Sequence, residues 1–160
     1  MTHFFILAIS TVDNTTCPDG WSGYSGNCYT FNINLDMDYF EADAFCKDKG
    51  GRLASLDTMD QRGWFTDAIQ SNSGTNASVS WWVGGYDHTG LDIWRWPSGN
   101  LGYFRSLQLE SIPYGNQCVR GIDRFLFIEA TDCTSHATAA ICQIHPCELI
   151  HTFIFEKLRF

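Results

Sequence analysis

Hydrophobic and polar positions alternate at helical spacing early in the chain. One helical face consists of Tyr39, Ala42, Phe45, Cys46 and Lys49. Asp38 precedes this face, and Glu41 follows three residues later, which is the pattern of a capping box. Gly50 and Gly51 then stop the pattern. The sequence therefore predicts a first helix of about three turns between Asp38 and Gly50.

A second helical face follows a short predicted strand at 52–56. Its members are Phe65, Ala68 and Ile69, with Trp64 beside them. Either Asp57 or Thr58 can cap this helix, because its side-chain oxygen can accept from a free N–H of the first turn. The polar run 70–80 is expected to be a loop.

The second half of the chain has the patterns of β-strands. Besides those at 29–31 and 52–56, strands are predicted at 81–84, 93–96, 118–122, 125–129 and 139–144. Residues 97–99 form a turn, and 100–117 carry few periodic signals. Two helices followed by a β-rich half indicate an α+β fold. A length of 160 residues suits a single domain.

The overall charge limits the partners. The net charge is -8, and Lys and Arg are not clustered anywhere. Nucleic acids and anionic membrane surfaces attract basic patches, so neither is an expected partner. No stretch of the sequence approaches the roughly 18 apolar residues that span a bilayer. We therefore expect no membrane span and a secreted product.

The cysteines indicate disulfides. They stand singly at 17, 28, 46, 118, 133, 142 and 147, without the C-x-x-C pairs of zinc ribbons and redox sites. Six cysteines allow fifteen pairings, among which spacing alone does not decide. The seventh, Cys147, is then free or forms a disulfide-linked dimer.

The N-terminal segment carries signs of secretion. Residues 4–9 resemble the hydrophobic region of a signal peptide, and 8–10 have the small-x-small form of a cleavage site. A truncated gene start is the alternative, because His3 stands where Lys or Arg is usual. Asn14 and Asn76 begin N-glycosylation patterns, which also occur by chance.

Several motifs occur together in a characteristic order. They lie at 17–21 with 28–29, 41–46, 51–56, 82–85, 94–99, and at the cysteines 118, 133 and 142. In this order they resemble the long form of the C-type lectin-like domain over about residues 17–145. Residues 82–85 resemble the W-I-G-L strand of that family, and 94–99 its W-x-W-x-x-G turn.

The resemblance implies a fold and a disulfide pattern. The implied fold is α+β, with two helices packed on two small antiparallel sheets and a long loop region. The implied disulfides are Cys17–Cys28, Cys46–Cys142 and Cys118–Cys133. The tail at 146–160 lies beyond the implied domain, and it is either an appended segment or translated non-coding sequence.

The resemblance also implies a degenerate calcium site. Sugar-binding members of the family hold Ca²⁺ with carboxylate, amide and carbonyl oxygens, of which the ion needs six to eight. The matching positions that keep side-chain oxygens are Gln108, Glu110, Asn116 and Glu129. Leu109 replaces the proline whose cis bond shapes the family's loop, Ala130 replaces an Asp, and Ile128 a Trp. No cofactor is therefore expected, with calcium as the alternative.

The long segment 100–117 holds residue types that are common at recognition surfaces. Tyr103, Arg105 and Tyr114 are the candidate ligand contacts. Phe104 lies near a position where the family often buries Trp. A small core under the loop is the alternative role for such aromatics.

Catalysis is not expected. The sequence contains no G-x-S-x-G, P-loop or H-E-x-x-H motif, and none of its five His stands at a metal-site spacing. We expect an extracellular module that binds a carbohydrate or protein ligand through the long loop without the usual calcium site. The alternatives are a calcium-dependent lectin and a secreted structural or antimicrobial protein.

Overall fold

The computed structural model describes residues 16–73, 79–87, 94–99, 107–109, 117–123 and 127–146, with only the backbone at 72–73 and 107–109. The elements are β1 (Ser22–Tyr24), β2 (Asn27–Met37), α1 (Tyr39–Asp48), β3 (Arg52–Leu53), α2 (Met59–Ser73), β4 (Trp81–Asp87), β5 (Leu107–Leu109), β6 (Gln117–Ile122), β7 (Phe127–Asp132) and β8 (Ala137–Ile144). The predicted signal peptide, both glycosylation sites, Cys147 and the rest of the tail lie outside the described residues.

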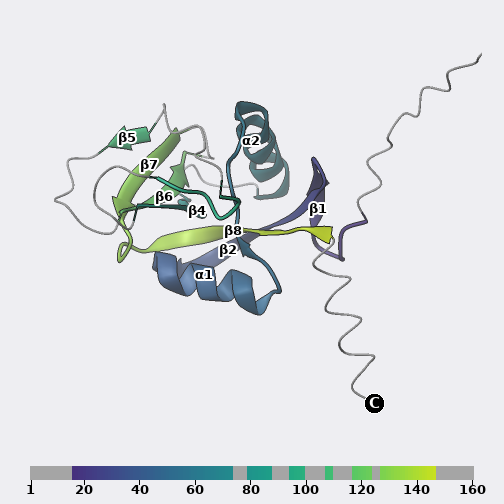
Figure 1. The fold of residues 1–160 in the computed structure, drawn as a ribbon, viewed down its shortest axis with the longest axis horizontal. Helices are drawn as coiled ribbons and strands as arrows, with labels where there is room; N and C mark the ends of the chain where they lie inside the picture. The colour runs from purple at the N-terminus through teal and green to yellow at the C-terminus, as the bar shows by residue number, and fades with distance from the viewer. Residues whose placement is uncertain are drawn as a thin grey trace, which may run out of the picture.

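The strands form one sheet in the order β1-β2-β8-β4-β6-β7-β5, with β3 paired to β8 (Figure 1). Two small antiparallel sheets were the expectation, and the structure joins them. The link is β4, which pairs in parallel with β8 and antiparallel with β6. The α+β fold class is confirmed, and the sheet is mixed because β4 and β5 each have a parallel partner.

The first helix begins as the sequence predicts. The N–H of Glu41 donates to Asp38 Oδ1 at 2.9 Å, and the N–H of Asp38 donates to Glu41 Oε2 at 3.0 Å. This reciprocal pair is the capping box, which satisfies two N–H groups of the first turn. Tyr39, Ala42 and Cys46 are the buried residues of the helix.

The second helix is longer than expected. Thr58 Oγ1 accepts from the N–H of Gln61 at 3.1 Å, which makes Thr58 the cap. The helix continues to Ser73, although a loop was predicted from Gln70. The polar residues 70–73 do not break a helix, since none of them is Gly or Pro.

Two predicted strands are shorter in the structure. Of 52–56, only Arg52 and Leu53 are strand, because Ser55 donates its N–H to the side chain of Gln143 at 2.9 Å. Of 93–96, the described residues 94–96 form a single bridge, between Arg95 and Tyr86.

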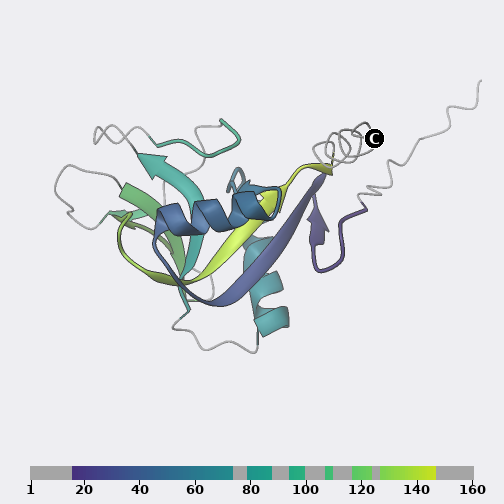
Figure 2. The ribbon, with the colours of Figure 1, turned by 90° about the horizontal axis from the view of Figure 1, so that it is seen from below.

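The helices cover opposite faces of the sheet (Figures 1 and 2). Residues of α2 pack with Tyr29, Trp81 and Val119 in one core cluster. Residues of α1 pack with Trp82 and Ala140 in the other. Trp81 and Trp82 are neighbours on β4 that point to opposite faces, as the strand geometry requires. Neither helix in the described chain has the length and apolar character needed to cross a membrane.

Three disulfides hold this arrangement. They join Cys17 to Cys28, Cys46 to Cys142, and Cys118 to Cys133. The first closes the N-terminal hairpin, the second ties α1 to β8, and the third ties β6 to the turn after β7. These are the pairings that the family resemblance implies.

Candidate ligand-binding site

The candidate site lies where β5 runs beside β7, at the edge of the sheet away from β1 (Figure 1). The pairing is parallel, with Gln108 opposite Glu129 and Leu109 opposite Ala130. The family resemblance assigns these two segments to a single calcium site. The backbone does bring them side by side.

Glu129 is bound to a cation of the protein itself. Its partner across the β6–β7 pair is Arg120, whose Nε donates to Glu129 Oε1 at 2.5 Å. The two side chains are only 24% and 12% exposed, for Arg120 and Glu129 respectively. Arg120 Nη1 also donates to the carbonyl of His136 at 3.4 Å. A guanidinium therefore neutralises the carboxylate that the resemblance implies as a metal ligand.

The neighbours of Glu129 on β7 face the core. Ile128 and Ala130 are each 1% exposed and belong to the cluster that contains Trp81 and Val119. Ala130 has no side-chain oxygen, and its methyl group packs among apolar side chains. The position that holds an acidic ligand in the family is thus part of the core in this chain.

The carboxylate of Asp132, at the end of β7, forms hydrogen bonds within the following turn. Its Oδ1 accepts from the N–H and the Oγ1 of Thr134, both at 2.8 Å. These hydrogen bonds lower the pKa of the Asp132 carboxyl. This carboxylate shapes the turn that leads to Cys133.

Together these contacts leave a poor environment for calcium. The ion requires several oxygen ligands with net negative charge. Glu129 is neutralised by Arg120, and Ala130 supplies no side-chain ligand. Within the ranges that the structure describes, no three His, Cys, Asp or Glu side chains gather in a way that could hold a metal ion. The described part of the site does not fit calcium.

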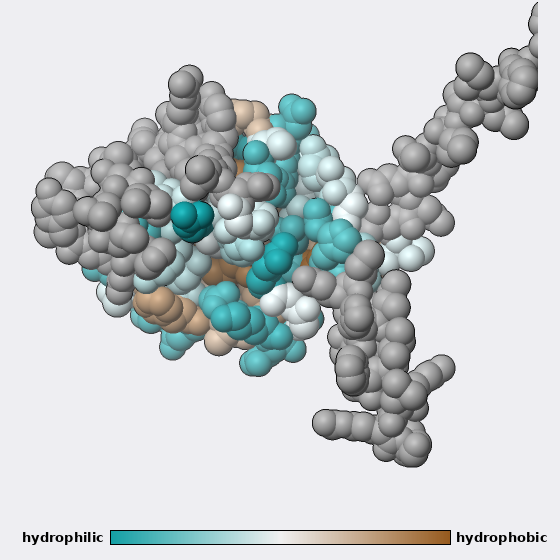
Figure 3. Space-filling model, in the orientation of Figure 1, coloured by the Kyte–Doolittle hydropathy of each residue, from teal (hydrophilic) through white to brown (hydrophobic). Residues whose placement is uncertain are grey.

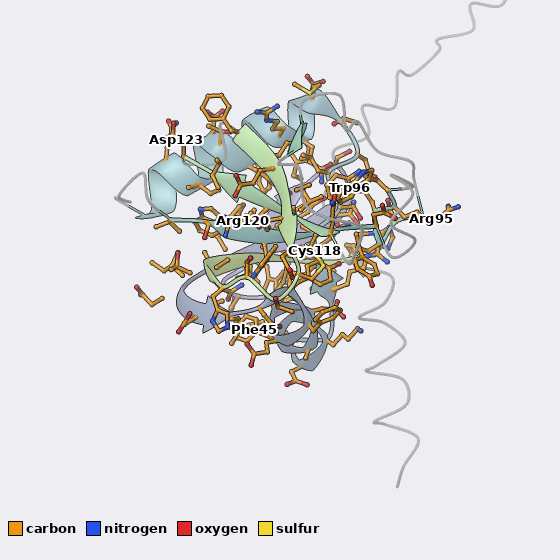
Figure 4. The ribbon with its side chains drawn as sticks, turned by 90° about the vertical axis from the view of Figure 1, so that its left-hand side faces the viewer. Phe45, Arg95, Trp96, Cys118, Arg120 and Asp123 are labelled. Atoms are coloured by element: carbon orange, nitrogen blue, oxygen red, sulfur yellow. A yellow bond between two sulfur atoms is a disulfide. The ribbon has the colours of Figure 1, made fainter. Side chains whose placement is uncertain are left out.

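The turn at 97–99, which precedes the long segment, is anchored to the connection between β3 and α2. Ser98 donates its N–H to Ser55 Oγ at 3.0 Å and its hydroxyl to Asp57 Oδ1 at 2.8 Å. Trp94 and Trp96 are buried on either side of Arg95. Figure 4 shows Trp96 directed inward and Arg95 directed away from the domain. The long segment thus starts from a fixed base.

Most of the predicted contact residues cannot be placed. Tyr103, Arg105, Glu110, Tyr114 and Asn116 lie outside the described residues, and of Gln108 only the backbone is described. Their assignment to the site remains a prediction. Glu129 is the one predicted site residue whose side chain is described.

Arg120 is the residue that sequence analysis missed. A signal for it exists, because Arg120 and Glu129 lie at equal distances from the turn between β6 and β7. An antiparallel hairpin places such residues opposite each other, with their side chains on the same face. An opposite-charge pair at symmetric positions could therefore have been found.

Known proteins share both sequence and fold with this chain. The galactose-specific lectin nattectin of Thalassophryne nattereri is 35% identical over 86 residues, which cover 54% of this chain and 52% of nattectin. Lithostathine of Rattus norvegicus is 33% identical over 92 residues, which cover 57% of this chain and 54% of lithostathine. The chain thus spans about half the length of these curated relatives. No model of a protein family matches it.

Solved structures agree over a larger part of the chain. Human lithostathine has a TM-score of 0.70 and 26% identity, covering 81% of this chain and 99% of that chain. The described residues have a C-type lectin-like fold. The Ca²⁺-independent C-type lectin SPL-2 of Saxidomus purpuratus shares the fold, with a TM-score of 0.66 and 21% identity, covering 81% of this chain and 94% of that chain. Glu129, which the family resemblance implies as a metal ligand, is paired with Arg120 in this chain.

Proposed function

We propose that this protein is an extracellular recognition module that binds a carbohydrate or protein ligand through residues 100–117 without calcium at the usual family position. The observation that carries the proposal is the ion pair between Arg120 and Glu129. Calcium would have to displace a guanidinium from a carboxylate that is largely shielded from water. Removing one partner of such a pair leaves the other charge unpaired, which is costly.

The related proteins support a binding role. Nattectin is a galactose-specific lectin, which favours a carbohydrate as the ligand class. SPL-2 is a C-type lectin that is Ca²⁺-independent, so this fold is compatible with such a role. Binding, not catalysis, is accordingly the activity that we propose.

The proposal extends to segments outside the described residues. Tyr103, Arg105 and Tyr114 are the proposed ligand contacts, on the lectin-like domain at 17–145. Secretion through residues 1–10 and N-glycosylation at Asn14 and Asn76 complete the proposal for an extracellular protein. A disulfide-linked dimer through Cys147, on the appended tail at 146–160, is also part of it.

A glycan array tests the proposed function. The oxidised protein is applied in millimolar CaCl₂ and, separately, in EDTA. We expect the same glycans to be bound in both conditions, with weaker binding for Arg105→Gln and Tyr114→Ala. Met59→Ser is the matched control, because Met59 is an exposed residue on α2. Binding that disappears in EDTA would show a calcium-dependent lectin instead.

A further inference from the structure

A second surface of the domain has the composition of a recognition site. Phe40 is a large aromatic residue on α1, yet it is 47% exposed. Its ring packs edge-on against those of Tyr39 and Tyr86, with centroids 5.7 and 6.4 Å away. Figure 3 shows hydrophobic surface over the end of α1 nearest the β6–β7 side of the domain. This aromatic group is therefore in contact with solvent.

Arg95 lies next to this aromatic group. The N–H of Arg95 donates to the carbonyl of Tyr86, and the N–H of Tyr86 donates to the carbonyl of Arg95, both at 3.2 Å. Cross-strand partners of this kind project their side chains on the same face. The Arg95 side chain is exposed and points away from the domain in Figure 4. No carboxylate among the residues with described side chains forms an ion pair with it.

The surroundings hold the Tyr86 ring and the backbone of Arg95 in place. The hydroxyl of Tyr39 donates to the carbonyl of Gly84 at 3.1 Å, and the Tyr39 ring stacks on that of Tyr86 with centroids 5.8 Å apart. Trp94 and Trp96, buried in the core, fix the backbone on either side of Arg95. Binding of a partner therefore requires little further ordering of these aromatic rings and of the Arg95 backbone, which favours affinity.

The chemistry of the surface defines its partner. Aromatic residues and Arg are enriched among residues that carry binding energy at protein interfaces. The Asp43 carboxylate is paired with Lys47, with Nζ and Oδ2 2.6 Å apart, and the Asp38 and Glu41 carboxylates beside Phe40 accept from backbone N–H groups of the capping box. The exposed guanidinium of Arg95 is left as the group that can pair with an acidic partner. The whole chain is at -8, which disfavours a polyanion but not a single carboxylate. The surface spans a helix flank and a strand end, which suits a protein partner.

We propose that Phe40, Tyr86 and Arg95, the α1 patch, bind a protein segment that presents an apolar side chain next to a carboxylate. The apolar side chain packs on Phe40 and Tyr86, and the carboxylate binds the Arg95 guanidinium, a pairing that can be bidentate. This surface shares no residue with the ligand site at β5 and β7. The proposal for this surface is therefore tested independently of the proposed function.

A displayed library of random dodecapeptides tests the α1 patch. We expect selection on the wild-type protein to enrich peptides with an aromatic or aliphatic residue beside Asp or Glu. Phe40→Ser and Arg95→Gln should each weaken the binding of those peptides about tenfold or more, and Met59→Ser should not. The charge reversal Arg95→Glu should enrich Lys or Arg in place of the acid, which a merely structural role of Arg95 does not predict.

The same variants identify the outcomes that overturn the proposal. It fails if no such consensus emerges, or if selected peptides bind all variants equally. Loss of glycan-array binding in Arg95→Gln would make the patch a glycan site instead. Self-association that is seen by sedimentation and abolished by Phe40→Ser would make it a contact between two copies. Circular dichroism and thermal unfolding show whether each variant is folded. If Phe40→Ser does not fold, Arg95→Gln still tests the proposal, because Arg95 is at an exposed position.

Discussion

At the scale of single residues, the proposal of binding without calcium rests on Arg120 and Glu129. Both side chains are mostly buried, and each satisfies the charge of the other. The chain offers a natural comparison in Asp43 and Lys47, an ion pair on the surface of α1 with side chains 29% and 66% exposed. Loss of one partner is expected to cost little stability in the exposed pair and much more in the buried pair, where the remaining charge is left unpaired.

Glu129→Gln is expected to lower the free energy of unfolding by about 1–3 kcal/mol, because it leaves the guanidinium without its counter-charge. Asp43→Asn is the matched control and is expected to cost about 0.5 kcal/mol or less. Urea unfolding monitored by circular dichroism measures both values. Equal losses in the two variants would mean that burial does not strengthen the Arg120–Glu129 pair.

Tyr29 links stability to alkaline pH. It is 1% exposed, and its hydroxyl accepts from Gln61 Nε2 at 2.8 Å. Burial, with a smaller contribution from the charge of Asp57, raises the pKa of Tyr29 from 10.0 to about 12. A raised pKa means that the folded state holds the proton more tightly. The stabilisation is therefore complete below pH 10 and is lost as the pH rises toward 12.

The free energy of unfolding is thus expected to fall as the pH rises above about 10, and to fall less steeply in Tyr29→Phe. Tyrosinate absorbance and circular dichroism, recorded on the same samples, measure ionisation and unfolding together. Burial raises the pKa of Tyr39 as well, so part of the alkaline loss remains in the variant. An identical slope in both proteins would contradict the assignment to Tyr29.

At the scale of elements, local signals predicted what local interactions determine. The capping box of α1 needs only Asp38 and Glu41, and both are visible in the sequence. The predicted strands at 52–56 and 93–96, of which 94–96 are described, are too long because alternation indicates burial, whereas strand pairing depends on a distant neighbour. Trp94 and Trp96 are buried as alternation predicts, but the backbone of Arg95 finds a single partner.

Close packing between elements depends on several glycines, of which Gly84 is one. A Cβ at Gly84 would lie 2.3 Å from Pro97 Cγ and 3.0 Å from the carbonyl oxygen of Leu53. A Cβ at Gly63, in α2, would meet nothing within 4 Å. Gly84 is thus required for β4 to approach the turn at 97–99, and Gly63 is not required for packing.

Gly84→Ala is accordingly expected to destabilise the protein by about 1–3 kcal/mol. Gly63→Ala should stabilise it by up to about 1 kcal/mol, because alanine favours the helix. Thermal unfolding separates the two by the sign of the change in midpoint. A neutral or stabilising Gly84→Ala would refute the close contact with Pro97.

At the scale of the whole molecule, sequence reasoning was limited by long-range contacts. The family resemblance provided the fold and the disulfide pattern, which spacing alone left among fifteen alternatives. The parallel pairing of β4 with β8 joins residues far apart in the chain, such as Trp81 and Ala139. No local pattern encodes it. The Arg120–Glu129 pair has a signal in the sequence, the symmetric positions of the two residues about a turn, but using it requires the correct hairpin register.

The disulfides are expected to differ in their contribution to stability. The Cys46–Cys142 bond spans 96 residues and the Cys17–Cys28 bond 11. The loss of chain entropy in the unfolded state predicts about 4–5 kcal/mol for the first and about 3 kcal/mol for the second. Replacing each pair by alanines and measuring urea unfolding tests this order. A larger loss from the short loop would contradict it.

The central claim is that the Arg120 guanidinium pairs with Glu129, which the family resemblance implies as a calcium ligand, and so leaves calcium no role at this position. The most direct test is the thermal unfolding midpoint of the oxidised protein in millimolar Ca²⁺ and in EDTA. An ion that binds only the folded state must raise the thermal unfolding midpoint. We predict the same midpoint in both conditions. A midpoint that rises with calcium concentration would contradict the account.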